Sequence, residues 1–296
     1  MSINMGMDLH SPRVSVIVPV YNEDEALGEM MSGLVEAMRG WPFEKELLIV
    51  DDGSEKAVTI DFSDFQARVI RHPCNLGNGA AVKTGIRNAT GEYCLILDGD
   101  GQHDPGEALG LIRQLSDYFL VIGARDFKKT GQFHRSLANR LLCRLASYMA
   151  QVEIDDLTSG FRAFRRKEVM ELIHLFPNGF SCPTTMTMGM AKLGYAVGFQ
   201  PIHVKGRVGR SKLRPMRDGV RFLVIILKMA TLFSPMRIFL PLALLMGTLG
   251  LLNYLVVLVC WSRFSVWSAV MFSTSISIFM IGLLAEALST TNLRRL

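Results

Sequence analysis

The chain has 296 residues, which is enough for one large domain or for a domain of about 200 residues followed by a smaller unit. Apolar residues make up 49% and charged residues 20%, and the positive mean hydropathy indicates that the apolar residues are unevenly distributed. The net charge of +5 is concentrated beside long apolar runs near the end of the sequence. This distribution argues against nucleic acid as a partner and favours anionic lipid head groups.

The first two thirds of the chain alternate short apolar runs with helical patterns, which is typical of an α/β domain with a mainly parallel sheet. Strands are predicted over residues 14–18, 46–50, 68–71, 93–97 and 119–122. Helices are predicted over 23–39, 79–88 and 107–116, where apolar residues recur with a helical period.

Polar residues cluster where three of the predicted strands end. These clusters are residues 21–23 (YNE), 51–54 (DDGS) and 98–100 (DGD). Ligands bind at the carboxyl ends of the strands in open α/β sheets. The sequence therefore predicts one site at this edge rather than three unrelated turns.

The turn at residues 98–105 (DGDGQHDP) is the strongest motif. Asp98 and Asp100 bring like charges together, which is unfavourable unless a cation lies between them. Their hard oxygen ligands indicate Mg²⁺ or Mn²⁺, an ion that takes its remaining ligands from water and substrate phosphates. Such an ion would neutralise the charge that develops on a departing nucleoside diphosphate.

Two further segments lie near this predicted site. Asp51 and Asp52 also follow an apolar run, and one of them could accept hydrogen bonds from a base or ribose; the alternative is an Asp-Gly turn. Residues 75–79 (NLGNG) lack the third glycine and the lysine of phosphate-binding loops. We expect them to form a helix N-terminus packed close to the site.

Two uncharged apolar runs follow, at residues 238–261 and 267–285. Each can cross the roughly 30 Å hydrocarbon layer of a membrane, which needs about 20 helical residues. We predict a hairpin of two transmembrane helices, over about 238–261 and 267–288. The alternative, two buried helices in a soluble core, is disfavoured because such helices rarely lack charge for so long.

Basic residues flank the hairpin on both sides, whereas its connecting loop holds only Arg263. The positive-inside rule then places both ends, and the preceding domain, in the cytoplasm.

Residues 214–233 form an amphipathic pattern, which predicts an interfacial helix lying along the lipid head groups. A basic surface helix of the soluble domain is the alternative. The expected organisation is an α/β domain over 1–212, a juxtamembrane helix over 213–234 and the hairpin over 235–290.

Five motifs carry a family resemblance. They are residues 16–23 (VIVPVYNE), 50–54 (VDDGS), 75–79 (NLGNG), 98–105 (DGDGQHDP) and 158–162 (TSGFR). In this order they resemble the family-two inverting glycosyltransferases of GT-A fold, and more narrowly their polyprenyl-phosphate branch. The resemblance covers about residues 14–228. It implies transfer of a sugar from a nucleotide-diphosphate sugar to a polyprenyl phosphate, undecaprenyl or dolichyl.

The resemblance also assigns roles to individual residues. The nucleotide-sugar pocket would comprise Pro19, Tyr21, Glu23, Asp51, Asp52, Gly77 and Asp98. Asp98 and Asp100 would hold the metal, with Gln102 beside them and Asp156 completing the catalytic set. The acceptor phosphate would meet Arg125, Arg135, Arg162, Arg207, Arg210, Ser211 and Lys212. Arginine suits this role because it binds phosphate through two parallel hydrogen bonds, although a solvated surface arginine is the alternative for Arg125 and Arg135.

The proposed acceptor affects the mechanism that we expect. A phosphate monoester has a second pKa of about 6, so it is mostly a dianion at neutral pH and needs no strong base. Three roles are open for Asp156: it orients the acceptor, acts as a base, or anchors loop 158–162. Residues 183–188 (PTTMTM) depart from many relatives, which carry an acidic residue on a helix there.

Two other functions compete with this reading. The first is a membrane glycosyltransferase with a hydroxyl acceptor, such as a lipid-linked saccharide or a polymer; against it, the chain has no QxxRW-like motif and few membrane helices. The second is a catalytically inactive membrane scaffold. The resemblance further implies self-association through the membrane helices and a location in the bacterial inner membrane.

Overall fold

The computed structural model of the protein describes residues 12–59, 66–125, 133–179, 181–204 and 234–293, together with positions 224, 227, 228 and 231. The chain divides into two compact units. The first consists of Met1–Arg144 and Glu153–Pro215, and the second of Leu145–Val152 and Met216–Leu296. The interfacial helix predicted over 214–233 lies outside the described residues, except for the isolated positions.

The first unit contains a seven-stranded sheet with the order β3-β2-β1-β4-β6-β5-β7. Its strands are β1 (Val14–Val20), β2 (Lys45–Asp51), β3 (Ala67–Arg71), β4 (Tyr93–Ile96), β5 (Leu120–Arg125), β6 (Arg162–Arg165) and β7 (Val197–Ile202). All neighbours are parallel except β6, which runs antiparallel to both β4 and β5. The mainly parallel sheet and its first five strands are confirmed, whereas β6 and β7 were not predicted.

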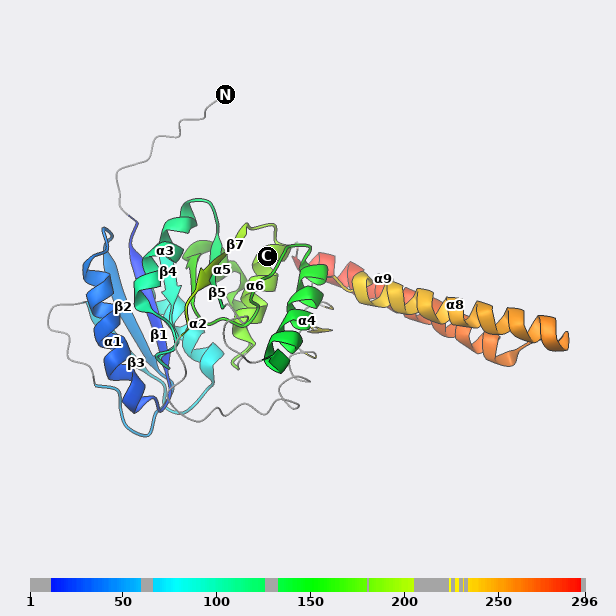
Figure 1. Cartoon of the computed structure of the whole chain (residues 1–296), viewed down its shortest axis with the longest axis horizontal. Helices are drawn as coiled ribbons and strands as arrows, with labels where there is room; N and C mark the ends of the chain where they lie inside the picture. Colours follow the sequence, from blue (N-terminus) through cyan, green and yellow to red (C-terminus); the bar gives the residue numbers. More distant parts are fainter. Residues whose placement is uncertain are drawn as a thin grey trace, which may run out of the picture. The chain divides into compact units, whose positions relative to one another are not determined.

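Helices cover both faces of this sheet (Figure 1). They are α1 (Asp24–Arg39) and α3 (Ala108–Arg113) on one face, and α2 (Asn78–Asn88), α5 (Arg166–Leu172) and α6 (Cys182–Lys192) on the other. The chain also forms α4 (Phe133–Ala150), whose last residues belong to the second unit. Short 3₁₀ turns η1 (Pro105–Glu107) and η2 (Gln114–Ser116) flank α3, and η3 (Ile173–Leu175) follows α5. The single helix predicted over 107–116 is therefore broken into three pieces.

The alternation of side chains along the strands explains the layers. Val16 and Val18 of β1 belong to one buried cluster with α1 and α3, whereas Ile17 belongs to a second cluster with α2, α5 and α6. A Cβ atom at Gly85 of α2 would overlap Cγ2 of Ile17. Glycine at this position therefore lets α2 pack closely on β1.

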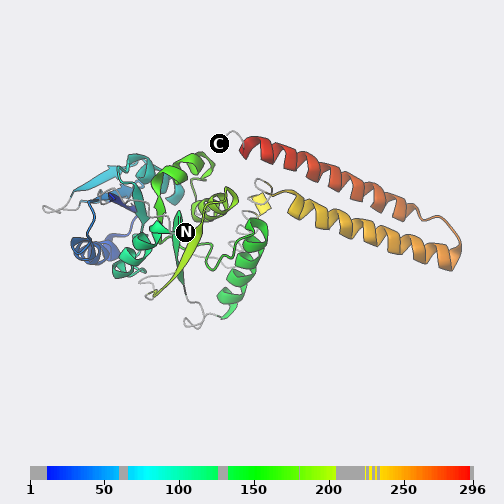
Figure 2. The same ribbon diagram turned by 90° about the horizontal axis from the view of Figure 1, so that it is seen from above.

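The second unit contains two long apolar helices, α8 (Met236–Trp261) and α9 (Val266–Leu293), which are long and apolar enough to cross a membrane. They run antiparallel and side by side (Figure 2), and small residues lie where they touch: a Cβ at Gly250 would lie 3.1 Å from Met271 Cβ. Ser275 Oγ also donates to the Ala243 carbonyl at 2.7 Å. Close approach through small residues and interhelical hydrogen bonds is typical of membrane helix pairs.

Candidate functional site

The loops after β1 and β2 are joined into one structure at the carboxyl edge of the sheet. The backbone N–H of Asn22 donates to Ser54 Oγ at 3.0 Å, and Asn22 Oδ1 accepts from the Glu55 N–H at 3.0 Å. Asn22 adopts a φ of 51°, which asparagine tolerates better than most residues. Val20, which lies between Pro19 and Tyr21, pairs with Asp51, and its carbonyl accepts the Asp52 N–H at 2.9 Å.

Asp52 holds a neighbouring loop in place. Its carboxylate accepts the backbone N–H groups of Leu76 at 3.0 Å and Gly77 at 2.8 Å, and it contacts Nδ1 of His72 at 2.7 Å. The side chain of Asp52 is almost fully buried. Its oxygens are therefore occupied by the protein itself, which favours the Asp-Gly turn reading over a direct hydrogen bond to a nucleotide.

Asp51 has a different environment. Its Oδ1 accepts the Ser54 N–H at 2.9 Å, while its Oδ2 lies 3.5 Å from Arg71 Nε and accepts no hydrogen bond from the described residues. The turn that follows requires glycine, because Gly53 has a φ of 75° and a Cβ there would lie 2.5 Å from the Cys74 carbonyl carbon.

The N-terminus of α2 packs tightly against residues 177–179, and residues 75–79 lead into this helix, as expected from the sequence. Gly77 has a φ of 101°, and a Cβ on Gly79 would overlap the Pro177 carbonyl oxygen. Lys83 Nζ donates to the Phe176 carbonyl at 3.1 Å, which adds a second link to the same loop. Gly77 is therefore placed between Asp52 and residues 177–179.

The acidic turn and loop 158–162 meet at the centre of the site. Asp98 follows β4, and a Cβ on Gly160 would overlap Oδ2 of its carboxylate. Asp100 Oδ1 accepts the backbone N–H of Gln102 at 3.2 Å, which shapes the turn. Asp98 and Asp100 are both partly exposed. The fold thus brings together two motifs that lie far apart in the sequence.

Arg125 and Asp156 form an ion pair next to this turn. The distances are 2.7 Å from Arg125 Nε to Asp156 Oδ2 and 3.0 Å from Arg125 Nη2 to Asp156 Oδ1. Burial disfavours the charged form of both groups, but their mutual hydrogen bonds and attraction outweigh it. The pKa of Asp156 is therefore lowered and the pKa of Arg125 is raised. Asp156 also accepts the Thr158 N–H at 3.0 Å, so it ties the loop to β5.

Arg162 is the last residue of loop 158–162 and the first of β6, and only 1% of its surface is exposed. Its guanidinium donates to the carbonyls of Ser159 and Pro183 and to Thr187 Oγ1, the last two at 2.8 and 3.3 Å. Burial lowers the pKa of Arg162 to about 10, so the group stays charged at neutral pH. The structure corrects the expectation that Arg162 meets the acceptor phosphate, because its donors already face protein oxygens away from solvent.

His103 belongs to the site although it was not among the predicted residues. The residue is 5% exposed, and its ring packs against Phe161 with 5.2 Å between centroids. Its backbone forms an antiparallel bridge with Val204. Burial lowers the pKa of His103 to about 4 despite the nearby charge of Asp100, so the ring is neutral at pH 7. The only signal in the sequence was its place directly after Gln102.

For most of the remaining predicted residues, the structure describes the backbone alone or does not describe the residue. Arg135 lies in α4, where the structure describes only its backbone. Arg207, Arg210, Ser211 and Lys212 lie outside the described residues. Glu23 immediately precedes α1 and is partly exposed.

The carboxylates of Asp98 and Asp100 fit a divalent cation whose remaining coordination positions are filled by substrate and water. Within the described ranges, no group of three or more His, Cys, Asp or Glu side chains could enclose a metal ion. Asp98 and Asp100 supply two hard oxygen ligands on partly exposed side chains, which is what Mg²⁺ or Mn²⁺ needs when water and phosphates fill the other positions.

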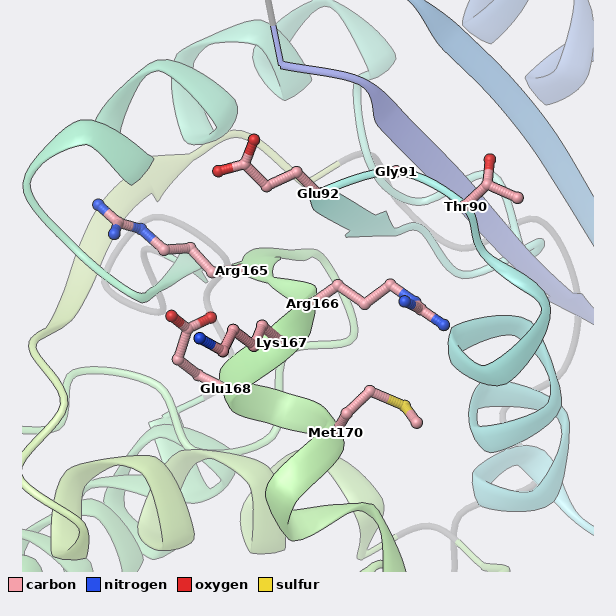
Figure 3. Close-up of a pocket in the computed structure, with 8 residues that line it drawn as sticks. All are labelled: Thr90, Gly91, Glu92, Arg165, Arg166, Lys167, Glu168 and Met170. Atoms are coloured by element: carbon pink, nitrogen blue, oxygen red, sulfur yellow. The ribbon is translucent and has the colours of Figure 1, made fainter. Parts of the chain in front are cut away.

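A pocket of about 530 Å³ lies at the opposite, amino edge of the sheet (Figure 3). Its lining residues are Thr90, Gly91, Glu92, Arg165, Arg166, Lys167, Glu168 and Met170. Arg165 donates to the Leu115 carbonyl at 2.7 Å and Arg166 to the Ile86 carbonyl at 3.0 Å. These two guanidinium groups cap neighbouring segments, and the pocket is separate from the acidic site.

Comparison with known proteins identifies both parts of the chain. Residues 15–173 match Glycosyl transferase family 2, and residues 234–291 match the GtrB C-terminal hairpin. Among the curated relatives, dodecaprenyl-phosphate galacturonate synthase of Rhizobium johnstonii is 26% identical over 172 residues, 55% of this chain and 51% of that protein. Dolichol-phosphate mannosyltransferase of Pyrococcus furiosus is 35% identical over 181 residues, 57% of this chain and 50% of that protein. The chain spans about half the length of these relatives.

The fold also resembles solved structures. Glucosyl-3-phosphoglycerate synthase from Mycobacterium tuberculosis, in complex with Mn²⁺, uridine diphosphate and glucosyl-3-phosphoglycerate, superimposes with a TM-score of 0.59. It is 19% identical, and the match covers 74% of this chain and 80% of that chain. This likeness confirms the expected GT-A fold. With the family match over residues 15–173, the conclusion is that the chain belongs to glycosyl transferase family 2.

Proposed function

We propose that the protein is a membrane-anchored inverting glycosyltransferase that moves a sugar from a nucleotide-diphosphate sugar to a polyprenyl phosphate. The observation that carries this proposal is the contact between the Asp98 carboxylate and Gly160, which joins the acidic turn to loop 158–162. It lies at the sheet edge where ligands bind in open α/β folds. Two relatives whose names refer to dodecaprenyl phosphate and dolichol phosphate support the choice of acceptor.

Asp98 and Asp100 are the residues that would hold Mg²⁺ or Mn²⁺, with Gln102 beside them. The ion, when bound, supplies positive charge for the departing nucleoside diphosphate. Related folds in complex with Mn²⁺ or Mg²⁺ and uridine diphosphate support a divalent cation here.

The loops after β1 and β2 would bind the nucleotide. Tyr21 is 41% exposed, so its ring is available to pack against a base. Asp51 shapes the loop after β2 by accepting the Ser54 N–H, and Asp52 holds Gly77 through its backbone N–H. In this proposal the acids shape the pocket, and backbone groups and Tyr21 contact the nucleotide.

Arg125 would place a fixed positive charge where the acceptor phosphate arrives. Asp156 holds its guanidinium in one orientation, and the side chain remains 26% exposed. A charge that is already oriented needs no reorganisation during the reaction. We assign Asp156 the anchoring role, because both of its oxygens accept hydrogen bonds and its lowered pKa makes it a weak base.

The apolar helices α8 and α9 would anchor the protein in a membrane. The positive-inside rule supports a cytoplasmic catalytic domain, and the inner membrane of a bacterium is the proposed location. The juxtamembrane cations Arg207, Arg210 and Lys212, together with Ser211, would meet the lipid phosphate at the head-group layer. Self-association through the hairpin is part of the same proposal.

The test is incubation of membranes containing the protein with labelled nucleotide-sugars and undecaprenyl phosphate. We expect a labelled monophosphoryl lipid that mild acid cleaves, and a loss of about 100-fold or more in Asp98→Asn and Asp100→Asn. Gly28→Ala is the matched control, because a Cβ there has no neighbour within 4 Å. Label that enters a lipid-linked saccharide or polymer but not the monophosphoryl lipid would favour the hydroxyl acceptor, and turnover that survives both Asn variants would disprove the metal site.

A further inference from the structure

The buried cation Arg162 begins the strand that pairs with the segment leading to Asp98. Arg162 begins β6 and pairs with Ile96 of β4, two positions before Asp98. Directly opposed residues of antiparallel strands have Cα atoms about 4.5–5.5 Å apart. Gly160, whose Cβ would overlap the Asp98 carboxylate, belongs to the same loop as Ser159, whose carbonyl accepts the Arg162 guanidinium. The strand register and loop 158–162 therefore place Arg162 near Asp98, close enough for the charge of the carboxylate to act on the guanidinium.

The immediate partners of Arg162 carry no charge. They are the carbonyls of Ser159 and Pro183 and the hydroxyl of Thr187. Burying a charged group is costly unless an opposite charge compensates it. The carboxylates whose charge acts on Arg162 are those of Asp156 and Asp98, and Asp156 is already paired with Arg125.

We infer that Arg162 is a positioning residue whose buried charge sets the balance of binding at Asp98: it weakens the hold on a free divalent cation and favours a bound diphosphate. The inference rests on the proposed function and deepens it. A cation near the carboxylate repels a metal ion that the carboxylate binds. The same charge attracts the phosphates that arrive with the ion, and salt screens it little because the guanidinium is buried.

Thr187 offers a way to change this balance while Arg162 is kept. Its Oγ1 lies 3.3 Å from Arg162 Nη1 in the buried part of α6. Thr187→Asp would place a carboxylate against the guanidinium and neutralise it locally. Thr187→Val has nearly the same shape and adds no charge, so it is the matched control. Arg162→Lys keeps the charge and removes the hydrogen-bond geometry.

The experiment measures Mn²⁺ binding to the full chain in detergent from the electron paramagnetic resonance signal of free Mn²⁺. Inorganic pyrophosphate binding in the presence of Mn²⁺ is measured by calorimetry. We expect Thr187→Asp to tighten Mn²⁺ binding by about threefold or more and to weaken pyrophosphate binding. Thr187→Val and Arg162→Lys should keep Mn²⁺ affinity close to that of the unmodified protein.

Other results overturn the inference. They are an unchanged or weaker Mn²⁺ affinity in Thr187→Asp, a shift in Thr187→Val of the same sign and size, and a weaker affinity in Arg162→Lys, which would show that geometry and not charge matters. If Thr187→Asp does not fold, Arg162→Gln, which removes the charge, replaces it: tighter Mn²⁺ binding supports the inference, and unchanged or weaker binding overturns it. Asp98→Asn separates the two proposals: if it still binds Mn²⁺ normally, the proposed metal site is wrong, whatever Thr187 shows.

Discussion

Arg125 and Asp156 face each other across the carboxyl edge of the sheet, with 2.7 Å between Nε and Oδ2 and 3.0 Å between Nη2 and Oδ1. The backbone N–H of Arg125 also donates to Oδ2, at 3.3 Å. Asp156 is fully buried, whereas the Arg125 side chain is 26% exposed. The carboxylate of Asp156 therefore holds the end of β5 and loop 158–162 in their relative positions.

Asp156→Asn should destabilise the fold more than it impairs a chemical step. Removing one partner of a buried ion pair costs about 3–5 kcal/mol, and the partial exposure of Arg125 places our expectation near the lower end, at about 3 kcal/mol. Thermal or chemical unfolding of the detergent-solubilised protein measures it. Glu36→Gln, which breaks the exposed pair with Arg39, should change stability by less than about 1 kcal/mol. A stable Asp156→Asn protein without turnover would instead indicate a catalytic base.

Gly160→Ala should impair metal binding and turnover. The new Cβ would overlap Oδ2 of Asp98, so the carboxylate has to rotate away from its present position. Misplacing a catalytic group by about 1 Å can cost 100-fold in rate, and we expect a loss of about that size. Steady-state kinetics and Mn²⁺ titration measure the effect. Gly28→Ala serves as the control because its Cβ meets open space; equal activity in the two variants would show that the contact with Asp98 is unimportant.

Asp52→Asn should loosen the loop that leads into α2. The carboxylate accepts the N–H groups of Leu76 and Gly77 and contacts His72. Hydrogen bonds to charged groups contribute about 1.5–3 kcal/mol each, and an amide can keep only part of this, so we expect a loss of roughly 2 kcal/mol. Unfolding experiments measure the loss, and faster proteolysis near residue 76 should accompany it. Intact stability with lost nucleotide binding would assign Asp52 a direct contact with the ligand.

Glu46 should make folding stability depend on pH in the acid range. Burial by itself would raise its pKa, but hydrogen bonds from Ser15, Thr90 and Arg68 lower the pKa from 4.5 to about 2. Since the folded pKa lies below the unfolded one, the stabilisation is complete above about pH 4.5 and is lost as the pH falls towards 2. At 1.36 kcal/mol per pH unit, it amounts to about 3 kcal/mol.

The measurement for Glu46 compares the unmodified protein with Glu46→Gln in chemical unfolding at several pH values. The difference in unfolding free energy should be largest near neutral pH and should shrink below about pH 4.5. A difference that stays constant down to pH 3 would contradict the assigned pKa direction.

Much of the fold could be predicted because its signals are local. The fully buried strand Val14–Val20 is a short, mostly apolar run bounded by polar residues, which is a local signal in the sequence. The short strand Arg162–Arg165 was missed because it has four residues and an arginine at each end. It is a strand only because it hydrogen-bonds to both β4 and β5, and such pairing depends on contacts far along the chain.

At the site too, local signals in the sequence show which residue types are present, whereas long-range packing decides what each residue does. The motif Asp98-Gly99-Asp100 and the apolar runs before and after residue 262 could be recognised from the sequence alone, because spacing and hydropathy are properties of neighbouring residues. Whether an arginine faces solvent or the interior is decided by which segments pack around it. Arg125 and Arg162 both looked like phosphate ligands, yet one ends in an ion pair at the edge and the other is 1% exposed beneath the loop.

The sequence by itself therefore determined the family, the α/β domain, the apolar hairpin and the acidic turn. The tertiary structure alone decided that Gly160 contacts Asp98, that Asp52 holds a loop, and that Arg162 is buried. The physical reason is that burial and hydrogen-bond partners arise from long-range packing, and the free energy of a charged side chain depends on those surroundings more than on its own identity.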